Sequence, residues 1–115
     1  MKRIGIPTSR GGLDDLVAER FGRAPTITIV SVDPSTRRIL SVEVVANPGA
    51  EAGSGAGVKA AQALADHGVE VYAGPSPGPN AYAALTALGI KIITVTGVTV
   101  REAVERVLEE LAENP

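Results

Sequence analysis

The sequence predicts an α/β domain built on a mixed five-stranded sheet, and three observations carry this prediction. Apolar segments of strand character alternate with segments of helical period in the second half of the chain. A turn signal at residues 33–36, Asp-Pro-Ser-Thr, joins two neighbouring strands as a hairpin. The length of 115 residues suits one domain with one hydrophobic core. We therefore treat residues 1–115 as a single domain.

Three strands are expected in the first half of the chain. Residues 4–6 are an apolar run ended by a proline and predict a short first strand. Residues 26–32 alternate Thr with Ile or Val, which indicates the second strand, and residues 39–45 return as the third. Residues 8–24 contain paired glycines and several charges, so we expect a long loop with one helical turn at residues 13–18. A connection of this length is often functional.

The second half of the chain predicts three helices that alternate with two strands. Each helix has apolar residues at helical spacing, and a glycine follows each of the first two where a C-terminal cap is expected. The last strand is almost wholly β-branched, as expected of a strand covered on both faces. In order, the elements are a helix at residues 57–67, a strand at 69–73, a helix at 80–88, a strand at 90–95 and a helix at 99–111.

A hairpin followed by βα units favours the strand order 3-2-1-4-5, with strand two antiparallel to the rest and helices on both faces. This is the three-layer, ribonuclease H-like arrangement. Strands one, three, four and five then point the same way, so the loops that follow them meet at one edge of the sheet. Ligands of open α/β sheets bind beyond the carboxyl ends of the strands. The functional edge is therefore predicted before any ligand is.

Composition excludes several classes of function. The net charge of -2 and an aromatic content of 3% provide neither a field nor stacking platforms for nucleic acid. Cysteine is absent from the sequence, which excludes disulfides, thiolate metal sites and thiol nucleophiles. The sequence has neither the long apolar run of a membrane span nor a signal-type N-terminus. We expect a cytoplasmic protein that binds neither nucleic acid nor membranes.

Glycine-rich loops before the three helices predict an anion-binding crevice at the functional edge. Free N–H groups at helix starts favour anions, and alternating glycines let a ligand approach the backbone. An arginine in the long loop adds a bidentate donor. The glycines also suit close packing of the helix, and Thr99 with Glu102 forms a capping box that explains both residues structurally. The candidate binding residues are Arg23, Gly53, Ser54, Gly55, Gly57, Gly78, Asn80, Gly97 and Thr99.

No catalytic constellation is visible in the sequence. The single histidine, His67, directly precedes a helix-ending glycine, so we expect it at the opposite edge of the sheet, near the last helical carbonyls. Phe21, the only phenylalanine, is expected to close the end of the core. Asp14, Asp15 and Glu51 are the carboxylates suited to hold a divalent cation, should they meet.

Four segments resemble the dinitrogenase iron-molybdenum cofactor biosynthesis family, in order and over nearly the whole chain. They are Phe-Gly-Arg-Ala-Pro at residues 21–25, the glycine run and helix start at 53–61, Gly-Pro-Asn-Ala at 78–81, and residues 97–104. The resemblance implies a ribonuclease H-like fold and a non-enzymatic protein that binds or carries an anionic metallocofactor or its precursor. An iron–sulfur or iron–molybdenum type cluster is the implied ligand, and a cofactor-donor or acceptor protein is the implied partner.

The sequence departs from cluster-handling members at two places. Such members commonly bring histidine or cysteine next to the Phe-Gly-Arg segment or among the glycines, where this chain has Arg20 and Ser54. A cluster would be held here by backbone donors, arginines and oxygen ligands, or through ligands shared with a partner. A binding or regulatory module for a small organic or phosphate anion, without metal, is the alternative. An enzyme acting through a carboxylate-bound cation is a third reading. We also expect residues 53–57 to be more mobile than the strands.

Overall fold

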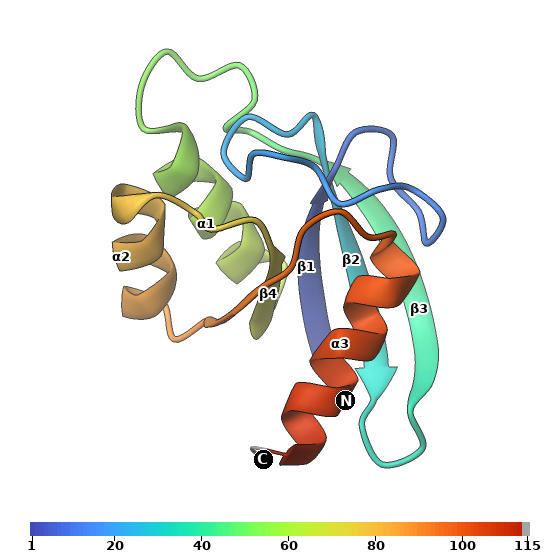
Figure 1. The fold of residues 1–115 in the computed structure, drawn as a ribbon. Coiled ribbons are helices and arrows are strands. Elements are labelled where there is room, and N and C mark those ends of the chain that lie inside the picture. The colour runs from blue at the N-terminus through green and yellow to red at the C-terminus, as the bar shows by residue number, and fades with distance from the viewer. Residues whose placement is uncertain (114–115) are drawn as a thin grey trace.

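A computed structural model of the protein describes residues 1–113 and has one mixed sheet with three helices (Figure 1). The strand order is β3-β2-β1-β4-β5; β2 is antiparallel to β1 and β3, while β4 is parallel to β1 and β5. This confirms the predicted ribonuclease H-like topology. The elements are β1 (Lys2–Thr8), β2 (Thr26–Asp33), β3 (Arg38–Ala46), α1 (Ala56–Asp66), β4 (Val71–Gly74), α2 (Pro79–Ala87), β5 (Lys91–Thr94) and α3 (Val100–Glu113).

Two hydrophobic clusters cover the two faces of the sheet and make the three layers. On one face α3 packs Val104 and Val107 against the β1 residues Ile4 and Ile6. On the other face α1 and α2 pack against β2 and β4, with Leu64 at the centre. Figure 1 shows α3 crossing one face while α1 and α2 lie together on the other. Since aromatic residues are scarce, the core consists mainly of aliphatic side chains and alanines.

The first strand continues past the proline that we expected to end it. Pro7 pairs with Ile27 of β2, while the pairing with β4 covers only Ile4 and Gly5. On the side where β4 no longer pairs, the Pro7 carbonyl accepts a hydrogen bond from the Ala18 N–H. The N–H that proline lacks would face this same side, where the ladder does not require it, so a central strand tolerates proline here.

The long loop between β1 and β2 contains no helical turn at residues 13–18, contrary to our expectation. Its backbone groups bond to the start of α3 instead: Val17 N–H donates to the Val98 carbonyl at 2.9 Å, and Leu16 bridges to Thr99. The Asp15 carboxylate accepts further N–H groups within the loop. These partners satisfy the backbone without local helix formation.

The two edge strands are exposed to different extents, and β5 departs from the expected coverage of both faces. β3 is exposed along almost its whole length, and its register shifts opposite Ser31 and Val32. β5 is the other edge strand: Ile93 is buried, but Lys91 and Thr94 are exposed, so its two faces are only partly covered. In the part of the chain that the structure describes, no helix is long and apolar enough to cross a membrane.

Candidate functional site

A hollow of about 370 Å³ lies at the carboxyl edge of the sheet, between the long loop and the starts of α1 and α2. Its volume lies at the small end of the range typical of ligand pockets, about 300–1,000 Å³. Three segments that are distant in the sequence line it. They are Glu19, Arg20, Phe21, Gly22 and Arg23 from the long loop, Ala56 and Gly57 from α1, and Ser76, Pro77, Gly78, Pro79, Asn80 and Ala81 around the start of α2.

The starts of α1 and α2 bring unsatisfied N–H groups to this hollow. The first helical bonds run from Lys59 N–H to Gly55 and from Tyr82 N–H to Gly78, so the N–H groups before Lys59 and Tyr82 have no partner within their helices. Neither N-cap glycine offers a side-chain bond, and neither helix has an acidic residue in its first turn. Each helix start carries a partial positive charge of roughly +0.5. Both ends are thus left open to an anion.

The start of α3 is closed by contrast. Val100 and Arg101 donate their N–H groups to loop carbonyls, and the Glu102 N–H donates to the Thr99 hydroxyl at 3.2 Å. The Glu102 carboxylate in turn accepts hydrogen bonds from the Thr99 N–H and hydroxyl, which completes the capping box. These bonds hold the pKa of Glu102 below its ordinary value.

A second hollow of about 460 Å³ lies beside the start of α3. It is lined by Gly97 together with Ser9, Leu16, Val17, Ala18 and Glu19.

The structure therefore gathers part of the predicted site. Arg23, Gly57, Gly78 and Asn80 line the first hollow. Gly53, Ser54 and Gly55 are exposed and precede α1, with Gly55 as its N-cap at a φ of 70°. Gly97 and Thr99 belong to the neighbouring region at the start of α3. The starts of α1 and α2 thus share one hollow. The start of α3 does not line it, and carbonyl groups of the long loop accept its first N–H groups.

Phe21, which lines the hollow, packs against a buried tyrosine. Phe21 lies 4.6 Å from Tyr72 between ring centroids, with the rings tilted by 57°. Tyr72 is fully buried and its hydroxyl donates to the Pro75 carbonyl at 2.6 Å. Burial raises the pKa of Tyr72 well above its ordinary value. Phe21 thus belongs to the core, as expected, and also lines the hollow.

Charged side chains surround the mouth of the hollow. Arg23 is exposed and donates from Nη1 to the Ala52 carbonyl, which ties the long loop to the segment before α1. Arg20 and Glu19 line the hollow beside it. The three side chains carry a formal net charge of about +1, to which the two helix starts add about +1 in partial charge. The site is electropositive in a protein whose overall net charge is -2.

Asn47 was the residue that the sequence analysis missed. It is buried, and its amide Nδ2 donates to the Phe21 carbonyl at 3.0 Å while its Oδ1 accepts the Gly49 N–H at 3.0 Å. The Asn-Pro-Gly order indicated only a chain break, since Asn is common in turns. Its bond to a residue 26 positions away follows from the fold.

The three carboxylates considered as a cation site do not come together. Asp15 accepts the N–H groups of Gly11, Arg10 and Ser9, and these bonds keep its pKa below the ordinary value against the opposing effect of burial. Asp14 pairs with Arg101 at 3.4 Å. Within residues 1–113 no group of three or more His, Asp or Glu side chains has a metal-binding arrangement. This geometry removes the basis for the carboxylate-bound cation.

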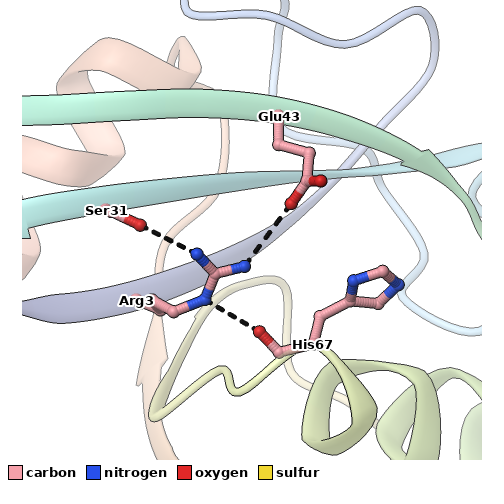
Figure 2. A network of polar contacts seen from close by, with 4 residues as sticks. All are labelled: Arg3, Ser31, Glu43 and His67. Atoms are coloured by element: carbon pink, nitrogen blue, oxygen red, sulfur yellow. Dashed lines mark hydrogen bonds and ion pairs between the residues drawn. The ribbon is translucent and has the colours of Figure 1, made fainter.

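His67 lies at the other end of the sheet, where the sequence placed it (Figure 2). It is the C-cap of α1, and its carbonyl accepts a bond of 2.8 Å from Arg3 Nε. Arg3 also donates to Ser31 Oγ at 3.1 Å and pairs with Glu43 at 3.4 Å. The guanidinium thereby stabilises the carbonyl end of α1. This network is structural and lies far from the hollow at the carboxyl edge.

The fold and the site define a class: a small ribonuclease H-like α/β domain with an electropositive hollow beyond the carboxyl ends of its strands. Comparison with known proteins identifies the family. The chain belongs to the dinitrogenase iron-molybdenum cofactor family, whose family model matches residues 1–110. The resemblance seen in the loop motifs is thereby confirmed.

Solved structures agree with this assignment. The apo form of the orange protein from Desulfovibrio gigas is 41% identical, with a TM-score of 0.83 over 96% of this chain and 89% of that chain. An NMR structure from Thermotoga, described as a NifB candidate of the DUF35 family, is 36% identical, with a TM-score of 0.74 over 95% of this chain and 89% of that one. A search of curated proteins gave no match.

Proposed function

We propose that this protein is a non-enzymatic binding or carrier protein that holds an anionic metallocofactor, or a precursor of one, in the hollow between Arg23 and the starts of α1 and α2. The family supports a role in handling the iron–molybdenum cofactor. The observation that carries the proposal is the contrast in capping. The two helix starts that line the hollow are left open, while the start of α3 is fully bonded.

The donor set of the hollow decides what kind of metal cluster it suits. Its lining contains backbone N–H groups, two guanidinium groups and the Ser76 and Asn80 side chains, and it has neither histidine nor cysteine. Such donors bond to the outer atoms of an anion and do not replace soft metal ligands. The proposed ligand is therefore a cluster that already carries its complete ligand shell. A partner protein would deliver or receive it.

The test is binding of isolated iron–molybdenum cofactor to the purified protein under anaerobic conditions. Metal should elute with the protein on gel filtration, and amide NMR signals of Gly57 and Asn80 should shift on binding. Arg23→Ala should weaken binding by about tenfold or more, the effect of losing one charge-assisted hydrogen bond of roughly 1.5–3 kcal/mol. A cofactor that elutes apart from the protein at every concentration tested would refute the metallocofactor proposal.

His67→Ala and Arg38→Ala are matched controls for Arg23→Ala. His67 belongs to the far end of the sheet, and Arg38 is an exposed cation at the start of β3. Both variants should bind the cofactor as the unchanged protein does. If His67→Ala abolishes binding while Arg23→Ala leaves it intact, the site lies elsewhere.

Inorganic phosphate and citrate test the alternative, a module for a small metal-free anion. The same open helix starts favour such anions. Phosphate or citrate that shifts the Gly57 and Asn80 amides, with no retention of the metal cofactor, would favour this second function. Retention of the metal cofactor, with weak and salt-sensitive phosphate binding, would favour the first.

A further inference from the structure

We propose that Asn47 is a positioning residue of this hollow: its side-chain amide locks the Phe21–Arg23 wall to the segment before α1, so that anion affinity depends on a residue that does not line the site. The inference rests on the proposed function, since it concerns the same hollow. Asn47 follows directly after β3, whose last residue is Ala46, and is 4% exposed.

The Asn47 side chain contacts two separate loops through both ends of its amide. Its Nδ2 donates to the Phe21 carbonyl at 3.0 Å and lies 3.5 Å from the Gly22 carbonyl. Its Oδ1 accepts the Gly49 N–H at 3.0 Å. The Asn47 backbone N–H donates to the Pro25 carbonyl at 3.1 Å. One buried side chain thus uses donor and acceptor together to hold the wall and the following loop in one geometry.

Close backbone contacts make this geometry sensitive to small shifts. A Cβ on Gly22 would lie 2.8 Å from the Gly57 nitrogen, so the wall already touches the start of α1. A Cβ on Gly49 would collide with the carbonyls of Gly22 and Ala56. The wall, the loop and the helix start are therefore packed backbone against backbone. Because Asn47 fixes two of these three parts, it sets where the N–H groups of α1 face the Arg23 side chain.

The locked region ends a few residues after Asn47. Arg23 donates to the Ala52 carbonyl, and the next residue, Gly53, has open space where a side chain would be. A Cβ at Gly55, the N-cap of α1, would likewise meet open space. The contacts that hold the segment before α1 thus run from Asn47 to Ala52.

Asn47→Asp keeps the shape, removes the donor and adds a negative charge, so Asn47→Ser, which removes the donor without adding a charge, is measured beside it. The new carboxylate would face the Phe21 carbonyl with no proton to donate, although it would still accept the Gly49 N–H. With inorganic phosphate as the probe, the affinity measured by amide NMR titration should fall by about tenfold or more. Hydrogen exchange should accelerate at the Ala24 amide, which donates to the Phe21 carbonyl, in the protein without ligand.

Thr28→Val is the matched control for stability. The Thr28 hydroxyl is buried, bonds to the Thr8 hydroxyl at 2.9 Å and accepts the Gly12 N–H at 3.1 Å, away from the hollow. The Thr28→Val variant should be less stable, as the loss of a hydrogen bond predicts, but its phosphate affinity and the exchange of the Ala24 amide should be unchanged. If Asn47→Asp folds poorly, Asn47→Ser offers a smaller change. The phosphate affinity of Asn47→Ser should lie between those of the unchanged protein and Asn47→Asp.

The outcomes separate this inference from the proposed function. Phosphate affinity equal to that of the unchanged protein in both Asn47 variants, with unaltered exchange at the Ala24 amide, would overturn the positioning role while leaving the hollow intact. If the unchanged protein binds neither phosphate nor the metal cofactor, the proposed function fails. Faster exchange at the Ala24 amide in Asn47→Asp would then still support the locking of the wall, but not its role in binding.

Discussion

Replacing Gly57 with alanine tests the close approach of α1 and α2 that shapes the hollow. A Cβ at Gly57 would lie 2.7 Å from the Ala81 Cβ, whereas carbon atoms in contact prefer about 3.5–4.0 Å. The helices would have to separate by about 1 Å. Overpacking of this kind costs about 1–3 kcal/mol, and alanine returns at most about 1 kcal/mol through helix propensity. We expect a net loss of about 1–2 kcal/mol in the free energy of unfolding.

Urea and thermal unfolding measure this loss, and a double-mutant cycle assigns its cause. In Gly57→Ala the Tm should fall by several degrees, at roughly 4 °C for each kcal/mol. Ala81→Gly removes the opposing methyl group, so the double variant should be more stable than the sum of the two single changes predicts. Gly53→Ala is the control, since its Cβ meets open space and its stability should be unchanged or slightly higher. A Gly57→Ala variant as stable as the unchanged protein, with no coupling to position 81, would refute the reasoning.

Three further perturbations follow from the polar contacts. Tyr72→Phe should lower the free energy of unfolding by about 1 kcal/mol, because the hydrogen bond to Pro75 is lost. Burial raises the pKa of Tyr72, so the unchanged protein keeps its full stability below pH about 10 and becomes less stable above it. Urea unfolding as a function of pH should show a smaller loss of stability at alkaline pH in the variant. Asp15→Asn should lower the Tm and flatten the decline of stability below pH about 4, because backbone donors lower the pKa of Asp15 and its stabilisation is lost on protonation. Glu19→Gln should tighten phosphate binding by about two- to threefold at low salt, because Glu19 repels an anion in the hollow, and the gain in affinity should be smaller at high salt. Weaker phosphate binding by the variant in a titration would contradict this.

The fold followed from the sequence because its signals are local and repeated. The apolar stripe of α3 reflects burial on one face of that helix, whereas β2, which the alternation of residues 26–32 predicted, is buried on both faces. The turn at residues 33–36 joins β2 to β3, and the two strands pair as a hairpin. Where prediction failed, a distant partner decided the structure. Val58 fits the helical spacing of the apolar residues in α1, yet its side chain is exposed, because the helix buries its alanines and Leu64 instead.

The candidate site was only partly readable for the same reason. Strand direction placed the helix starts at one edge, which brought Gly57, Gly78 and Asn80 to one hollow with Arg23. The sequence alone did not reveal that the long loop would satisfy the N–H groups of α3. The role of Asn47 depends on a carbonyl 26 residues away, and periodicity contains no trace of such a bond.

The exposed edge strand β3 has a consequence for how this protein behaves in concentrated solution. Its outward apolar side chains, Leu40, Val42 and Val44, are the kind of surface on which another chain adds a strand and fibres begin to grow. Arg38 and Glu43 on the same strand, with the irregular register opposite Val32, oppose that growth. The charges on this strand thus act against edge-to-edge association when the protein is concentrated.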